Sequence, residues 1–73
     1  MRWCYRSPFG VLEIVPKRNG NFVLVLDGEE FDESHSPQAV ADNLYTHTSG
    51  FFEWDVSDFD GPTDLSEWTY ISK

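Results

Sequence analysis

The segment from residue 36 to residue 50 constrains the fold most, because the sequence marks both of its ends as helix ends. Ser36 is suited to cap the N-terminus, Pro37 fits the first helical turn, and Gly50 can end the helix in a left-handed conformation. An apolar stripe of helical spacing lies between them and contains Val40, Ala41, Leu44 and Tyr45. This stripe must cover another apolar surface, and the β-rich run before it is the candidate.

The residues before the helix predict that surface to be a sheet. Four short runs of apolar or alternating residues, 2–6, 11–15, 22–26 and 29–32, are separated by turn residues such as Asn19-Gly20 and Asp27-Gly28. We expect Leu12 to face the interior and residues 22–26 to form the central strand. Residues 29–32 then form a charged edge strand, with Phe31 facing the core.

The segment after Gly50 has no clear period, but it is rich in aromatic residues and therefore unlike a disordered tail. We expect ordered loop around a helical turn near residues 63–68, capped by Thr63 or Asp64, and a final strand over residues 68–71. The predicted fold is α+β. A three- or four-stranded antiparallel sheet is followed by one helix packed on one face and by an aromatic-rich C-terminal wrap, and residues 1–73 form a single domain.

Charge is strongly segregated along the chain. The net charge is −8, and the segment from Asn19 to Ser72 contains no lysine or arginine. Twelve of the thirteen acidic residues lie in that segment, the exception being Glu13. Such a segment repels nucleic acid and anionic membranes and attracts basic protein surfaces.

Cysteine use and hydropathy indicate the compartment. The single cysteine, Cys4, excludes an internal disulfide, which is typical of a reducing compartment. The longest apolar run, residues 22–26, is too short for a membrane span or a signal core. We therefore expect a soluble cytoplasmic protein.

The sequence offers little catalytic chemistry. His35 and His47 lie near opposite ends of the predicted helix, too far apart to share a metal or relay a proton, and His47 is placed to favour the negative helix end when protonated. Cys4 is more simply a buried or edge-strand thiol than a nucleophile. We therefore expect no enzymatic activity, no catalytic residue and no cofactor.

The residues Asp58, Asp60, Gly61, Asp64 and Glu67 match part of the spacing of a calcium-binding loop. The first position of that loop requires a carboxylate, but Val56 occupies it here. The flanking segments are not convincing helices either. The sequence therefore favours an acidic loop and no metal site.

Two interpretations of the acidic residues remain open. In the first, they only solvate the outer surface of an aromatic core. In the second, they imitate the phosphate backbone of DNA, which presents one charge per roughly 1.7 Å of axis, and thereby occupy a basic surface of a partner protein. The residues expected to bind the partner are Glu29, Glu30, Asp32, Glu33, Asp42, Glu53, Asp55, Asp58, Asp60 and Asp64.

Residues 36–50, the Trp54-Asp55 pair and residues 62–68 resemble a group of small uncharacterised bacterial proteins with a Ser-Pro-x-x-Ala-Ala helix, a Trp-Asp pair and a Leu-Ser-x-Trp end. This resemblance implies a helix-on-sheet module and no activity. In size and charge the chain is also similar to phage-encoded DNA-mimic inhibitors of the anti-CRISPR type. The charge segregation alone motivates the expected function, inhibition of a nucleic-acid-binding protein, and the alternative is an accessory protein-binding module whose acids confer solubility.

Overall fold

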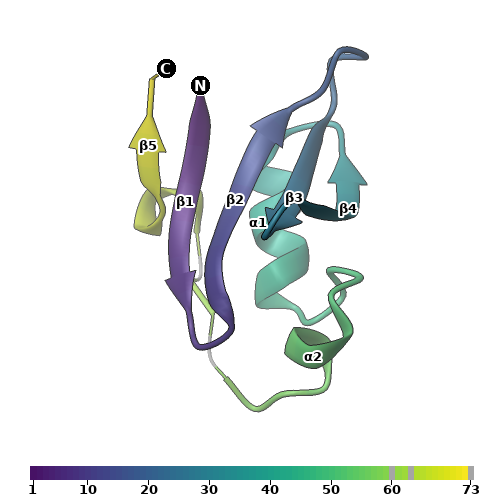
Figure 1. Ribbon diagram of the computed structural model, residues 1–73, viewed down its shortest axis with the longest axis vertical. Coiled ribbons are helices and arrows are strands. Elements are labelled where there is room, and N and C mark those ends of the chain that lie inside the picture. The colour runs from purple at the N-terminus through teal and green to yellow at the C-terminus, as the bar shows by residue number, and fades with distance from the viewer. Residues whose placement is uncertain (60, 63, 73) are drawn as a thin grey trace.

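The fold is α+β, with a five-stranded antiparallel sheet and one long helix (Figure 1). The computed structural model describes residues 1–59, 61–62 and 64–72. The strand order is β4-β3-β2-β1-β5. The strands are β1 (Arg2–Ser7), β2 (Gly10–Pro16), β3 (Phe22–Leu26), β4 (Glu29–Ser34) and β5 (Thr69–Ile71).

The sheet has five strands and not the three or four that the sequence predicts, because the final strand joins it. β5 pairs with β1, at the edge of the sheet opposite β4. The central strand is consequently β2, and the expectation that residues 22–26 occupy the centre is wrong. Residues 22–26 form the longest apolar run, so hydropathy placed β3 at the centre of the sheet. β1 has β5 as its second neighbour only because a segment more than sixty residues away folds back onto it, and this extra strand moves the centre to β2.

Tight hairpins join the first four strands, as the turn residues predict. Two residues connect β3 to β4, and both have left-handed backbones, with φ of 52° at Asp27 and 82° at Gly28. This combination matches the twist of the flanking strands. The turn sets Leu26 opposite Glu29, so these two side chains share one face of the sheet.

Helix α1 (Pro37–Tyr45) begins where predicted but ends earlier. The Ser36 hydroxyl accepts the Ala39 N–H at 3.1 Å, which confirms the cap. The helix ends before His47, which has φ of 60°, and Gly50 does not close it. The His47 N–H donates to the Leu44 carbonyl and the Thr48 N–H to the Asn43 carbonyl, so a histidine occupies the position at which glycine is usual.

One face of the sheet is covered and forms the core. Helix α1 lies behind the sheet in Figure 1 and buries Val40, Ala41 and Leu44 against Leu12 and Ile14. Leu12 is fully buried, as predicted. Among the described residues, no helix covers the opposite face, which we call the uncovered face.

The C-terminal segment wraps the molecule with more regular structure than expected. It contains a short helix that the sequence did not predict, α2 (Phe52–Asp55), and a 3₁₀ turn, η1 (Leu65–Glu67), before β5. Trp54 of α2 is fully buried, and its indole N–H donates to the Leu44 carbonyl at 2.7 Å. The side chain of Asp64 caps η1, as one of the two predicted caps, while Thr63 lies outside the described residues.

Helix length also bears on membrane insertion. Across the residues that the structure describes, none of the helices has the length and apolar character needed to cross a membrane.

Candidate functional site

The acidic residues expected to bind a partner divide into two groups according to their contacts. Six of them form hydrogen bonds or ion pairs within the chain: Glu30, Asp32, Glu33, Asp42, Asp55 and Asp64. Three others, Glu29, Glu53 and Asp58, are exposed, and no partner for their carboxylates exists among residues 1–59, 61–62 and 64–72. The tenth, Asp60, lies outside the described residues.

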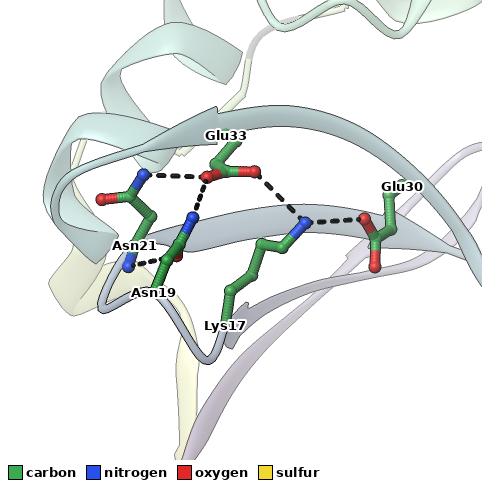
Figure 2. A network of polar contacts seen from close by, with 5 residues as sticks. All are labelled: Lys17, Asn19, Asn21, Glu30 and Glu33. Carbon is green, nitrogen blue, oxygen red and sulfur yellow. Dashed lines mark hydrogen bonds and ion pairs between the residues drawn. The ribbon is translucent and has the colours of Figure 1, made fainter.

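The first group includes a network on the uncovered face around Lys17 (Figure 2). The Lys17 ammonium lies 3.3 Å from Glu30 Oε1 and 3.2 Å from Glu33 Oε1. The Asn21 and Asn19 amides donate to Glu33 Oε2 at 2.8 Å and 3.0 Å. The loop between β2 and β3 therefore binds two glutamates of β4.

This network changes the protonation of its members. Hydrogen bonds from Asn21 and Asn19, together with the hydrogen bond and charge of Lys17, lower the pKa of Glu33 from 4.5 to about 2. Hydrogen bonds to Glu33 and Glu30 raise the pKa of Lys17. The Lys17 ammonium is thus bound to two carboxylates of β4, so the charge of this network is −1 (one ammonium and two carboxylates).

Asp32 and Asp55 have structural roles that the sequence did not indicate. The Asp32 carboxylate accepts a hydrogen bond from the Asn43 amide and so connects β4 to α1. Asp55 Oδ1 accepts the backbone N–H and the hydroxyl of Ser49, at 3.0 Å and 2.8 Å, and Asp55 Oδ2 accepts the Gly50 N–H at 3.0 Å. Ser49 is fully buried, so Asp55 satisfies donors that have no access to water.

Asp42 and Asp64 make only local contacts. Asp42 accepts the side-chain amide of Gln38 one turn earlier in α1, at 2.8 Å, and Asp64 caps η1. Both residues are exposed and still direct charge outward. Their carboxylates are therefore accessible to a partner, whereas that of Asp55 is taken up by hydrogen bonds from Ser49 and Gly50.

Two members of the second group, Glu29 and Glu53, border a hollow of about 330 Å³ between the β3–β4 hairpin and α2, whereas Asp58 does not. Three carboxylates line it, those of Asp27, Glu29 and Glu53, and we call them the rim carboxylates. The rest of the lining is apolar, and we call it the aromatic floor: Phe9, Leu26, Phe31 and Phe51. Within the floor, the Phe51 ring lies 4.8 Å from that of Phe31 and 5.5 Å from that of Phe9.

Sequence reasoning missed Asp27 and the floor. It treated Asp27 only as a turn residue and Phe31 only as a core residue. One signal was available, because a two-residue turn after Leu26 sets Glu29 on the core-facing side of β4. A carboxylate on that side marks the place where the core opens to solvent.

The histidines do not form a site with the acids. His35 is exposed, while the His47 ring stacks on Trp54 with centroids 5.6 Å apart and contacts the Phe59 carbonyl through Nε2 at 3.0 Å. His47 does lie at the C-terminal end of α1, as expected, but its ring is directed to α2 and the following loop. Of the described residues, no three His, Cys, Asp or Glu side chains are placed to hold a metal ion.

Cys4 lies on the uncovered face beside an ion pair. Its thiol donates to Glu13 Oε2 at 3.6 Å, and the Arg2 guanidinium lies 3.3 Å from the same oxygen. Cys4 is half-buried in β1, which is paired on both sides, so it is neither the fully buried nor the edge-strand thiol that the sequence favoured. The Glu13 carboxylate therefore contacts both the Cys4 thiol and the Arg2 guanidinium.

The geometry thus gives two acidic regions, one bound internally by Lys17 and one open around an aromatic floor. Comparison of the chain with protein-family models, with curated proteins and with solved structures gives no match, so its function is argued from these residues alone.

Proposed function

We propose that this protein is a non-enzymatic interaction protein whose acidic surface occupies the basic, nucleic-acid-binding surface of a partner protein. The observation that carries the proposal is charge segregation. Every described lysine and arginine, Arg2, Arg6, Lys17 and Arg18, comes from β1 or from the β2–β3 loop, and the segment from Asn19 to Ser72 contains twelve of the thirteen acidic residues and no lysine or arginine. Such a surface competes with nucleic acid for the same lysines and arginines of a partner.

Such mimicry is expected of an inhibitor that a phage encodes against a bacterial defence protein. Binding should then be rapid and strongly dependent on salt, because charge complementarity steers association and is screened by ions. The surface available to the partner is smaller than the acid count suggests, since Asp32 and Asp55 are bound internally.

A direct test is capture of binding proteins from a bacterial lysate on the immobilised full chain, at low and at high salt. The proposal predicts recovery of a nucleic-acid-binding protein that high salt or competing duplex DNA releases. The variant Glu29→Lys/Glu53→Lys/Asp58→Lys should fail to retain it. These three positions are chosen because reversal of Asp55 would break buried hydrogen bonds and unfold the chain.

The alternative, an accessory module that binds protein through its sheet, is favoured by the uncovered face. Val11 on that face is 47% exposed, and Val15 and Val25 lie on the same side of the sheet. In that case the captured protein would resist high salt. The Val11→Ser variant should bind that protein more weakly, whereas the triple lysine variant should bind it as the wild type does.

A further inference from the structure

We propose that the hollow between the β3–β4 hairpin and α2 binds the guanidinium group of an arginine side chain from the partner. This inference rests on the proposed function, because it names the place on the acidic surface at which one basic side chain is anchored. The hollow has a volume of about 330 Å³. Pockets of roughly 300 Å³ and above are large enough to enclose a ligand group.

The charge of the hollow is uncompensated. Its rim carboxylates come from three places in the chain: Asp27 from the turn, Glu29 from the start of β4, and Glu53 from α2. Within the described part of the chain, none of the three rim carboxylates accepts a hydrogen bond or forms an ion pair. The nearest lysine in sequence, Lys17, is bound to Glu30 and Glu33 on the other face of the sheet. Carboxylates placed around an apolar surface concentrate negative potential at the mouth of the hollow.

The apolar floor decides which cation fits. A hard divalent ion needs roughly six to eight oxygen ligands, and the aromatic floor supplies none. The three rim carboxylates are also not grouped closely enough to hold a metal ion among the described residues. The hollow therefore suits an organic cation, with an apolar face for the floor and polar edges for the rim.

Arginine meets this requirement better than lysine. The guanidinium group is planar and weakly hydrated, stacks on aromatic faces, and carries its N–H donors at its edge, where they reach carboxylates. A lysine ammonium is compact and strongly hydrated, so it would lose more water on entering the hollow. The half-buried rings of Phe9 and Phe31 offer the surface on which a guanidinium would stack.

Internal hydrogen bonds hold the hollow in shape. Ser49 Oγ accepts the Phe51 N–H at 3.2 Å, and Ser49 is itself held by Asp55. This arrangement fixes Phe51 in the floor and the start of α2, which carries Glu53. A site that is already formed loses less conformational entropy on binding.

The test uses three short Gly/Ser peptides that carry arginine, lysine or citrulline at the same positions. Binding to the full chain is measured by titration calorimetry at low salt and by amide NMR shifts. We expect the arginine peptide to bind about tenfold more tightly than the lysine peptide, and citrulline, which has the shape of arginine without its charge, not to bind. The amide signals of Glu29, Phe51 and Glu53 should shift most.

Two double variants with the same change in charge locate the site. Glu29→Gln/Glu53→Gln should weaken the arginine peptide about tenfold, whereas Asp42→Asn/Asp58→Asn should weaken it by about twofold or less, as a general field effect. Equal losses in both variants, or no preference for arginine, would overturn the inference. A wild-type chain that binds none of the peptides would also overturn it, while salt-dependent capture of a nucleic-acid-binding protein would still support the proposed function.

Discussion

Strand β4 carries two kinds of glutamate within five residues. Glu30 and Glu33 lie on the uncovered face, where Lys17 and two asparagines of the β2–β3 loop bind them. Glu29 lies on the helix side at the mouth of the hollow, and it has no partner among the described residues. The difference shows that acidic composition alone does not identify a binding surface, because part of the charge is used to hold the fold together.

The same contrast recurs in α2, where Asp55 is bound by three donors and Glu53 lies two residues away without any in the described chain. We call the internally bound acids Asp32, Glu30, Glu33 and Asp55 the structural acids. Substituting structural acids should change stability or protonation. Substituting rim carboxylates should change binding.

The largest expected effect is that of Asp55→Ala. The substitution leaves the buried N–H and hydroxyl of Ser49 without an acceptor, which should lower the free energy of unfolding by about 3 kcal/mol. Chains of this length have roughly 4–11 kcal/mol in total, so the variant should be close to unfolding. Urea denaturation followed by tryptophan fluorescence measures the change.

Asp58→Ala is the matched control for Asp55→Ala. Asp58 is an exposed aspartate three residues later, so its removal should leave stability within about 0.5 kcal/mol of wild type. Similar urea midpoints for the two variants would contradict the structural role of Asp55.

A smaller loss is expected for Asn43→Ala. The Asn43 amide donates to the Asp32 carboxylate and, at 3.2 Å, to the Ser34 hydroxyl, and thereby joins α1 to β4. Loss of a hydrogen bond to a charged group should cost about 1.5 kcal/mol. The double-mutant cycle with Asp32→Asn measures the coupling directly, and additive effects would show that the contact does not contribute.

These contacts also explain how far sequence reasoning reached. Local signals predicted the helix start at Ser36, the hairpin turns and the inward-facing Leu12, because neighbouring residues determine them. The pairing of β5 with β1 and the position of Asp55 depend on contacts made only after the chain folds back. The end of α1 was missed for a different reason, since His47 adopts a left-handed backbone that glycine usually provides.

The candidate site divides in the same way. Charge segregation is visible in the sequence and predicted the acidic surface as a whole. The roles of single carboxylates are not visible, because Lys17 and Glu33 are sixteen positions apart and meet only across the sheet. The aromatic floor likewise combines Phe9 with Phe51, which are 42 positions apart in the sequence.

The network around Lys17 predicts a change in protonation. Asn21→Ala should raise the pKa of Glu33 from about 2 toward 4.5, because the Asn21 hydrogen bond is the largest single cause of the lowering, and Lys17→Met, which removes a hydrogen bond and a charge, should raise it as well. The folded-state pKa is the lower one, so Glu33 stabilises the fold above pH 4.5 and this contribution is lost as the pH falls to about 2.

Carboxyl carbon NMR titration of Glu33 measures that pKa in the wild type and in both variants. In Asn21→Ala, stability should fall less between pH 4.5 and about 2 than in the wild type. A pKa of Glu33 that is unchanged in Asn21→Ala would show that the asparagine amide does not bind the carboxylate in solution.

The smallest expected effect is a change in the free energy of unfolding, and its sign differs between the rim carboxylates and the two glutamates bound by Lys17. Glu29→Gln/Glu53→Gln removes carboxylates that repel each other in a chain of net charge −8, so it should raise the free energy of unfolding by about 0.5 kcal/mol or less at low salt. Glu30→Gln/Glu33→Gln removes the same charge but also the partners of Lys17, so it should lower stability. Urea unfolding at low and high salt measures both, and the gain should vanish at high salt because ions screen the repulsion.

A destabilised rim variant would mean that these carboxylates also serve the fold. A stabilised one would show that the chain retains charge at the hollow against its own stability, which is the behaviour expected of residues kept for binding.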